Sequence, residues 1–297
     1  MSRAGSLVSM QVTKQDVLLV IPTFRPTRSV IELVEKLKLT TIVADDASPV
    51  TADSILRELT ALPKTTVVRN FRNEGIARGL NQGVAYARTN GYEWLLTLDQ
   101  DSEVDADYAR AILSAAHERE SLWSQRPTVG VIAPHQVIDA SGVMNYPTRI
   151  VDAITVTEEV IQSGSLWRVS ALAQIGGFDE KLGIDAVDAA ACLHLREAGY
   201  LVALTDTVEL HHNLGDSRQV NLLGKTIMVT NHSPARRANM VRNRLRLAPA
   251  EFKQSPVHAA RSLRRVTVNS VLGGLTGTDR WAKTKGALSG LIPHKPS

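Results

Sequence analysis

The sequence has very little cysteine and no long apolar segment. Cys192 is the only cysteine among the 297 residues, which excludes an intrachain disulfide and a zinc site made of several thiolates. The apolar runs are short, such as residues 17–21, and none approaches the roughly 18 residues that a membrane-spanning helix needs. The first sixteen residues contain no apolar stretch of signal-peptide length, so we expect a cytoplasmic protein.

Aromatic residues are also scarce, and acidic residues are nearly absent from the last part of the chain. Phe, Trp and Tyr together make up 4% of the residues, which leaves few rings to stack on nucleic-acid bases. Up to Ser217 there are 19 basic and 28 acidic residues, whereas from Arg218 onward there are 15 basic residues and two acids, Glu251 and Asp279. Such a basic segment is typical of a region that meets phosphates, nucleic acid or an anionic membrane, although a solvated helical face has the same composition.

Strand and helix patterns alternate through the first half of the chain. Continuous apolar or β-branched runs predict short strands, and helical spacing of apolar residues predicts helices between them. This order indicates an α/β layer fold around a mostly parallel sheet, followed by loops, short strands and, from residue 231, basic helices. The predicted strands cover residues 17–21, 41–44, 65–68, 94–98, 129–133 and 201–205, and the predicted helices cover 29–39, 52–62, 75–89, 106–120 and 188–198.

The first candidate site is the pair Asp99 and Asp101, which directly follows the predicted strand at 94–98. In open α/β sheets ligands bind beyond the carboxyl ends of the strands, and residues two apart in an extended segment point to the same side. Both carboxylates can therefore face one point, and their hard oxygen atoms suit Mg²⁺ or Mn²⁺. The alternative is a pair of loop acids that cap the following helix.

Two further segments lie at predicted strand ends or helix starts. Asp45 and Asp46 end the second predicted strand, where a carboxylate can accept a hydrogen bond from a nucleotide base or ribose, or instead form a turn. The segment from Asn73 to Gly83 has glycines four residues apart, but polar residues within it exclude a membrane dimerisation motif. It fits a helix start beside a phosphate, tight packing of a helix on the sheet, or both.

Acids and histidines in the second half are also candidates. Asp188 extends the apolar stripe of the predicted helix at 188–198, and an inward-facing carboxylate there can serve as a base in a partly dry cleft. Alternatively, Asp185 caps this helix and Asp188 stabilises its first turn. His211 and His212 can complete a metal site or contact phosphate, or they can have a structural role.

Taken together, these segments resemble the inverting family 2 glycosyltransferases of the GT-A fold, closest to the bacterial rhamnosyltransferases that use dTDP-L-rhamnose. The matching motifs span about residues 16–245 and follow one another in the family's order, which is far more specific than any single motif. They are IPTF at 21–24, VADDAS at 43–48, NEG at 73–75, LTLDQDS at 96–102, SGSL at 163–166, IGGFD at 175–179, GIDAVD at 183–188, HNLG at 212–215 and RN at 242–243.

The resemblance implies a role for each matched residue. Asp188 would be the general base, and Asp99, Asp101 and His212 would form the site for Mn²⁺ or Mg²⁺, with Asp99 also near the ribose. The residues that would border the nucleotide-sugar are Pro22, Thr23, Asp45, Asn73, Gly75 and Asp99, and those on the acceptor side are Gly164, Asp185 and Arg242.

The resemblance also implies the division of the chain and the reaction. A GT-A catalytic domain at 1–217 would have a nucleotide-sugar half at about 16–133 and an acceptor half at about 134–217, and a basic helical extension would follow at 218–297. The implied reaction is a metal-assisted direct displacement that moves a sugar, L-rhamnose from dTDP-L-rhamnose, to an acceptor hydroxyl in cell-surface polysaccharide or glycolipid assembly. Since many acceptors in this family are lipid-linked sugars, the basic extension is expected to approach the inner membrane face.

The chain departs from the family pattern at three positions. Ala190 stands where family members carry an acid, His194 where they carry Arg, and Gly183 where an aromatic is frequent. These departures bear on acceptor geometry and donor choice, and they keep open a UDP-galactofuranosyl or UDP-hexosyl transferase, or a nucleotide-sugar-binding protein without turnover. A sugar-phosphate nucleotidylyltransferase would need a Gly-rich basic loop after the first strand, which residues 22–26 lack, and the scarcity of aromatics disfavours a nucleic-acid binder.

Overall fold

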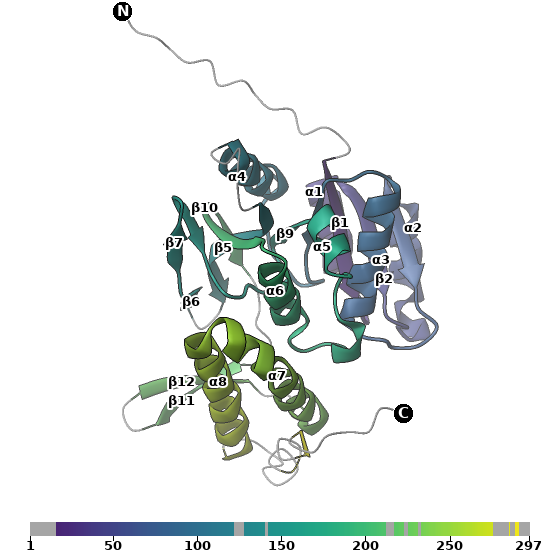
Figure 1. The fold of residues 1–297 in the computed structure, drawn as a ribbon. Coiled ribbons are helices and arrows are strands. Elements are labelled where there is room, and N and C mark those ends of the chain that lie inside the picture. Colours follow the sequence, from purple (N-terminus) through teal and green to yellow (C-terminus); the bar gives the residue numbers. More distant parts are fainter. Residues whose placement is uncertain are drawn as a thin grey trace, which may run out of the picture.

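The computed structural model describes residues 16–121, 128–139, 142–211, 217–222, 225–230, 233–275, 285 and 289–290, which form an α/β fold around one large sheet (Figure 1). The strands of this sheet are β1 (Val17–Thr23), β2 (Thr40–Asp45), β3 (Thr65–Arg69), β4 (Trp94–Thr97), β5 (Val129–Asp139), β6 (Gly142–Asn145), β7 (Arg149–Val151), β8 (Ile154–Val156), β9 (Ser165–Arg168) and β10 (Leu201–His211). Their order is β3-β2-β1-β4-β9-β5-β10-β8-β7, and β6 pairs with β5.

One half of the sheet has the alternation of strands and helices that the sequence predicts. β3, β2, β1 and β4 pair in parallel, and α1 (Arg28–Leu37), α2 (Asp53–Ala61) and α3 (Ile76–Thr89) connect them, with a short 3-10 turn, η1 (Val50–Ala52), before α2. Because the carboxyl ends of parallel strands meet at one edge, the residues that follow β1, β2 and β4 are brought together there.

The other half of the sheet is mixed. β9 pairs antiparallel with both β4 and β5, whereas β10 pairs in parallel with β5. β6, β7 and β8 add antiparallel pairs, so the expectation of a mostly parallel sheet holds for the β3-to-β4 half and the β5–β10 pair but not for the whole. The antiparallel direction of β9 places Ser165, at its start, beside Thr97, at the end of β4.

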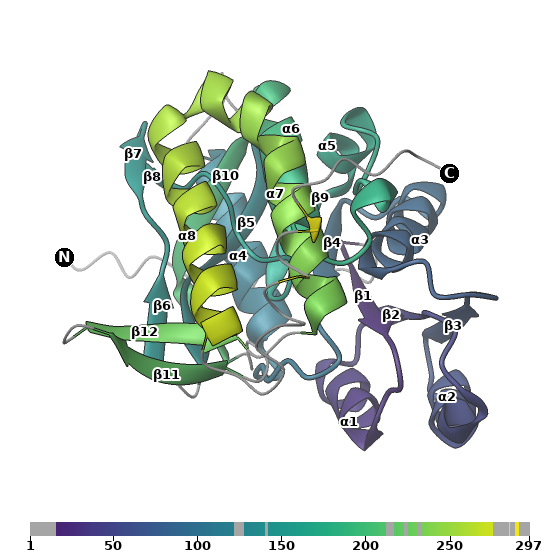
Figure 2. The ribbon, with the colours of Figure 1, turned by 90° about the horizontal axis from the view of Figure 1, so that it is seen from below.

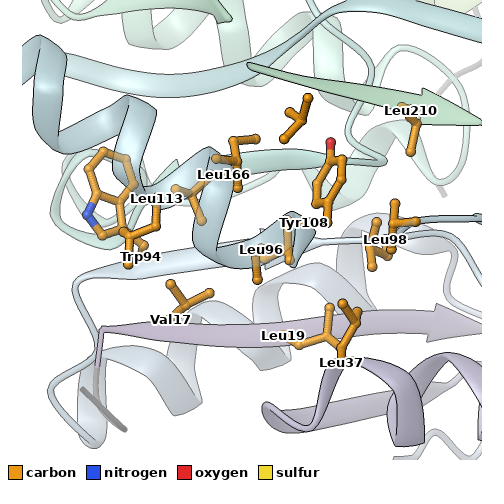
Figure 3. Close-up of a cluster of buried hydrophobic side chains, with 14 of the residues drawn as sticks. Val17, Leu19, Leu37, Trp94, Leu96, Leu98, Tyr108, Leu113, Leu166 and Leu210 are labelled. Carbon is orange, nitrogen blue, oxygen red and sulfur yellow. The ribbon is translucent and has the colours of Figure 1, made fainter. Parts of the chain in front are cut away.

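Both faces of the sheet are buried, which explains the continuous apolar strands. Along β1, Leu19 belongs to a core under α1, α2 and α4 (Tyr108–Ser121), and Val20 belongs to a second core on the opposite face. That second core contains α3, α5 (Val169–Gln174) and α6 (Val187–Glu197), and η2 (Glu180–Leu182) lies just before α6. Figure 3 shows part of the first core, with Leu96 of β4 and Tyr108 of α4 among its side chains.

The segment after residue 217 begins with a hairpin that the sequence does not predict. β11 (Ser217–Leu222) pairs antiparallel with β12 (Lys225–Thr230), and the expected helices follow as α7 (Pro234–Gln254) and α8 (Pro256–Leu275). The side chain of Ser233 caps α7 by accepting a hydrogen bond from the Arg236 amide at 3.3 Å. The expected extension is therefore not purely helical; α7 and α8 lie side by side, and α7 also contacts α6 (Figures 1 and 2). Among the described residues, no helix is a candidate for crossing a lipid bilayer.

Candidate active site

A cavity of about 790 Å³ lies at the edge where β1, β2 and β4 end. Its walls come from these strand ends, the start of α3, the segment before β9, the segment before α6 and the start of α7. The lining residues are Pro22, Thr23, Phe24, Ala44, Asp46, Asn73, Glu74, Gly75, Ile76, Gly79, Asp99, Gln100, Asp101, Ile161, Gln162, Ser163, Gly183, Ile184, Asp185, Ala186, Asp188, Arg236 and Asn239.

Asp99 and Asp101 both line this cavity, as their position after a buried strand predicts. The backbone N–H of Asp99 lies 3.0 Å from Ser102 Oγ and 3.1 Å from Ser163 Oγ, and the Asp99 carboxylate accepts a hydrogen bond from Gln162. Burial raises the pKa of Asp99 to about 7, and the nearby charges of Asp101 and Asp188 contribute to the shift. Carboxylates that repel one another in this way form a donor set that a divalent cation would stabilise, so these residues fit Mn²⁺ or Mg²⁺.

The wall of the cavity carries many more negative than positive groups. Among the described lining residues, the only guanidinium or ammonium group is that of Arg236. A diphosphate could bind here only together with cations that offset this negative charge. The acidic lining residues are Asp46, Glu74, Asp99, Asp101, Asp185 and Asp188.

Three buried polar atoms at the cavity wall have no hydrogen-bond partner among the described residues. They are Thr23 Oγ1, Gln162 Oε1 and Asp185 Oδ2. A buried polar atom without a partner costs about 1–3 kcal/mol, so the wall is complementary to a ligand that carries hydrogen-bonding groups.

One side of the cavity is built from the ends of β1 and β2 and the start of α3. The Asp46 carboxylate accepts hydrogen bonds from the backbone N–H groups of Glu74 (2.8 Å) and Gly75 (2.9 Å), which fixes the chain just before α3. Gly75 has φ +90°, and a Cβ added there would lie 2.6 Å from the Gly183 carbonyl oxygen, so only glycine fits. Pro22, Thr23, Asn73 and Gly75 all line the cavity, and their contact with a nucleotide-sugar stays a prediction.

Asp45 does not line the cavity, although the sequence analysis places it beside the nucleotide. Its side chain is fully buried below the wall, where it accepts a 3.1 Å hydrogen bond from the Ser48 amide and pairs with Arg69 at 3.2 Å. In the described structure this carboxylate stabilises the loop after β2, and the neighbouring Asp46 faces the cavity instead.

Two other predicted residues, Gly164 and Arg242, also lie outside the lining, and a third is not among the described residues. Gly164 is outside the cavity lining, because its carbonyl accepts a 2.7 Å hydrogen bond from the Tyr108 hydroxyl behind the wall. Arg242 is outside the lining as well, and it donates to Asn239 Oδ1 at 2.8 Å, which orients a residue that does line the cavity. His212 lies outside the described residues.

Asp188 lies in the first turn of α6 and lines the same cavity. Burial raises the pKa of its carboxyl, and the negative charge of Glu159 adds to this effect. A carboxylate with a raised pKa takes up a proton more readily than an ordinary aspartate, which suits a general base.

Asp185 does not cap α6, contrary to one of the two sequence interpretations. The residue before the helix is Ala186, whose φ of +64° is left-handed and whose side chain makes no cap. Asp185 Oδ1 instead pairs with Arg236 Nε at 3.3 Å, and burial raises the pKa of the Asp185 carboxyl. The start of α7 is therefore part of the cavity wall.

The sequence analysis missed Gln162, Arg236 and Asn239 as site residues. Gln162 belongs to a loop without hydrophobic periodicity, and only the neighbouring SGSL motif pointed to that region. Arg236 was counted only as part of the basic segment, and Asn239 gave no signal. Both belong to the chain after residue 217, which the sequence analysis treated as an extension.

A second group of possible metal ligands lies outside the cavity lining. Oxygen and nitrogen atoms of Glu159, Glu251 and His258 all lie within 4.8 Å of one another. However, Arg244 Nη1 lies 2.8 Å from both Glu159 Oε2 and Glu251 Oε1, so a guanidinium already occupies the place of a cation. Burial alone would raise the pKa of Glu159, but Arg244, His258 and Arg265 outweigh it and hold that pKa well below its usual range. This group is an internal ion-pair network, and the Asp99–Asp101 pair is the better metal site.

Comparison with known proteins supports the identification from the motifs. Residues 20–138 match the model of glycosyl transferase family 2. The chain is 30% identical over 200 residues to the dTDP-rhamnosyl transferase RfbF of Shigella flexneri. That alignment covers 63% of this chain and 64% of the relative, so it spans somewhat less than two thirds of the relative's length.

Solved structures with low sequence identity share the architecture. Staphylococcus aureus TarS superposes with a TM-score of 0.59 at 14% identity, over 93% of this chain and 48% of that one. The mannosyltransferase PcManGT of Pyrobaculum calidifontis, solved with GDP-Man and Mn²⁺, superposes with a TM-score of 0.52 at 17% identity, over 93% of this chain and 80% of that one. The chain therefore has the GT-A fold, and its residues 20–138 are similar to glycosyl transferase family 2.

Proposed function

We propose that this chain is an inverting glycosyltransferase that moves a sugar from a nucleoside diphosphate sugar to an acceptor hydroxyl. The observation that carries the proposal is that the Asp99–Asp101 pair and Asp188 line the same cavity, although nearly ninety residues separate them in the chain. The cavity volume of about 790 Å³ is within the range of pockets for small ligands, roughly 300–1,000 Å³.

In this proposal Asp99 and Asp101 act on the donor, and Asp188 acts on the acceptor. Asp99 and Asp101 would hold Mn²⁺ or Mg²⁺, which supplies positive charge to the nucleoside diphosphate as it leaves. Asp188 takes the proton of the acceptor hydroxyl while the hydroxyl oxygen forms a bond to the anomeric carbon. The bond from that carbon to the diphosphate oxygen breaks in the same step, so the anomeric configuration is inverted and no covalent enzyme intermediate forms.

The donor that we favour is dTDP-L-rhamnose, because the curated relative is a dTDP-rhamnosyl transferase. The bound molecules of the structural neighbours differ, with UDP-GlcNAc in one TarS structure and GDP-Man in the mannosyltransferase. Sequence identities of 14–17% indicate a shared fold but not a shared donor. UDP-hexoses and UDP-galactofuranose are therefore the alternative donors. The acceptor that we propose is a carbohydrate or lipid-linked sugar of cell-surface polysaccharide or glycolipid assembly.

A thermal-shift screen of dTDP- and UDP-sugars, each with and without Mn²⁺, tests the donor. We expect dTDP-L-rhamnose with Mn²⁺ to raise the unfolding midpoint by about 5 °C at a ligand concentration near one hundred times its Kd, where binding adds about 2.7 kcal/mol. Without Mn²⁺ the shift should be much smaller, because the acidic wall repels the diphosphate. If no nucleotide sugar shifts the midpoint even with Mn²⁺, the proposal is wrong.

A nucleotide-sugar-binding protein without turnover is the second candidate, because Ala190 and His194 depart from the family pattern. The position of Ala190 argues against this second hypothesis, since the residue is fully buried in the core and does not line the cavity. Calorimetry with nucleotide sugars, combined with an assay for donor hydrolysis or transfer, separates the two functions. Binding without any release of nucleoside diphosphate would favour the binding protein.

We also propose that α7 and α8 contact an anionic membrane surface peripherally, where a lipid-linked acceptor would be presented. Not all arginines of this basic segment are available for such a contact, since Arg237 is buried and donates to the Asn269 carbonyl. The exposed residues that remain combine positive charge with apolar area. They are Arg246, Phe252, Lys253, Val257, Arg261, Arg264 and Arg265.

Co-sedimentation with anionic vesicles tests this contact. We expect binding at low salt that falls strongly at about 0.5 M salt, because salt screens the charges of exposed arginines. The double variant Arg261→Ala, Arg264→Ala should bind more weakly than the wild type, whereas neutral vesicles should not bind either protein. No binding to anionic vesicles at either salt concentration would indicate an acceptor that is not held at a membrane.

A further inference from the structure

The loop that leads into Asp188, residues 181–186, lies between the start of α3 and the helix α7. On the α3 side, the Ala77 N–H donates to the Gly183 carbonyl at 3.3 Å, and Gly75 packs directly against Gly183. On the other side, side chains of α7 reach the backbone of the same loop. The position of this loop decides where the first turn of α6, and with it Asp188, meets the cavity.

The backbone of this loop is in an unfavourable conformation just before α6. Gly183 has φ +69°, which glycine adopts freely. Ala186 has φ +64°, where its Cβ crowds the following carbonyl group. A non-glycine residue stays in this region only where the surrounding structure holds it there.

The side chain of Asn243 supplies that support. It is 3% exposed, and its Nδ2 donates two hydrogen bonds of 2.8 Å, one to the Leu182 carbonyl and one to the Asp185 carbonyl. The two acceptors lie on either side of Gly183 and just before Ala186. The two N–H groups of one amide therefore fix both ends of the turn.

Two neighbouring side chains of α7 add weaker contacts to the same loop. Arg246 donates to the Lys181 carbonyl at 3.4 Å, and Arg236 pairs with the Asp185 carboxylate. Asn243 itself does not line the cavity, so any effect it has on the reaction must act through the loop.

We propose that Asn243 is a positioning residue, which places Asp188 for proton transfer by fixing the loop at 181–186. The inference rests on the proposed function, in which Asp188 is the general base. A base must lie within hydrogen-bond reach of the proton that it takes. A displacement of about 1 Å from that geometry lowers the rate roughly a hundredfold, even when the substituted residue is remote from the chemistry.

The variant Asn243→Ala tests the proposal through the separation of kcat from nucleotide affinity. We expect kcat to fall about a hundredfold because Asp188 is misplaced. The Kd for nucleoside diphosphate with Mn²⁺ should stay within about threefold, since the strand-end wall is unchanged, and a role limited to stability would not produce this split. Should Asn243→Ala fail to fold, Asn243→Ser, which keeps one hydroxyl donor in the buried space, is expected to show the same separation.

Gln254→Ala is the matched control on the same helix. Gln254 Nε2 donates to the Leu193 carbonyl at 3.3 Å, so it ties α7 to α6 by the same kind of bond but far from the loop. We expect its kcat to stay within about threefold of the wild type.

Three results would overturn the proposal. Equal losses of kcat in Asn243→Ala and Gln254→Ala would mean that activity depends only on the packing of α7 against α6. An equal loss of kcat and of nucleotide affinity in Asn243→Ala would assign the loop to donor binding, and unchanged kcat would remove the role altogether. If the wild-type protein binds no nucleotide, the proposed function itself is wrong. This result is distinguishable from the three above, because it does not depend on any variant.

Discussion

The Asp188→Asn variant is expected to lose about three orders of magnitude in kcat while it binds nucleoside diphosphate as the wild type does. Asparagine has nearly the same size but cannot take the proton of the acceptor hydroxyl, and a positioned base contributes typically 10²–10⁴ in rate. A thousandfold loss corresponds to about 4 kcal/mol of transition-state stabilisation. The measurements are the release of nucleoside diphosphate from the donor and, by calorimetry, the Kd of the nucleotide with Mn²⁺.

The control for this substitution is Asp179→Asn. The Asp179 side chain caps the short helix before the loop by accepting a hydrogen bond from the Lys181 amide at 3.0 Å, and asparagine can accept the same bond. We expect near-normal turnover in the control, since Asp179 does not line the cavity. Near-normal turnover in Asp188→Asn would mean that another group takes the proton.

The wild-type pH profile gives an independent check on Asp188. Only the ionised carboxylate can accept a proton, so kcat/KM should fall as the pH drops through the pKa of this group. Because burial raises that pKa, the loss on acidification should begin at a higher pH than for an ordinary aspartate.

The second large effect is expected from Asp101→Asn and from removal of the divalent ion. Asp101 lines the cavity beside Asp99, and the wall is too acidic to accept a diphosphate without added positive charge. We expect kcat/KM for the donor to fall at least about a hundredfold in the variant, because the ion contributes several kcal/mol to stabilising the leaving group. The concentration of Mn²⁺ that gives half-maximal activity should rise as well.

The matched control is Asp105→Asn, an exposed acid four residues further along that does not line the cavity. Its metal requirement should equal that of the wild type. Chelation by EDTA should abolish activity of the wild type, and added Mn²⁺ or Mg²⁺ should restore it. Full activity after complete removal of divalent ions would contradict the role of Asp99 and Asp101.

The first half of the fold could be predicted because its elements depend on local patterns. The β1 run, residues 17–23, is apolar at nearly every position because the strand is buried on both faces, and that pattern is visible in the sequence. β9 could not be predicted in the same way, since it is only four residues long and the region around it, residues 161–178, contains several Gly and Ser residues. Its antiparallel place depends on contacts over about 70 residues of sequence with β4 and about 35 with β5.

The candidate site was predictable where a residue acts by its place at a strand end or a helix start. Asp99, Asp101 and Asp188 are of this kind, and all three line the cavity. Asp45 and Asp46 show the limit, because the last residue of β2 and the residue after it point in different directions, and only the tertiary structure shows that Asp46 faces the cavity.

The sequence by itself determined the alternation of strands and helices, the carboxylates at the strand ends and the resemblance to a glycosyltransferase family. Each of these depends on short patterns or motifs of neighbouring residues, which can be recognised without the structure. The resemblance already pointed to the RN motif at 242–243, but only the tertiary structure decided how α7 takes part, with Arg236 and Asn239 in the wall and Asn243 against the loop before Asp188. The physical reason is that side chains of α7 meet backbone carbonyls and carboxylates about 50 to 60 residues earlier, and no local pattern records such a contact.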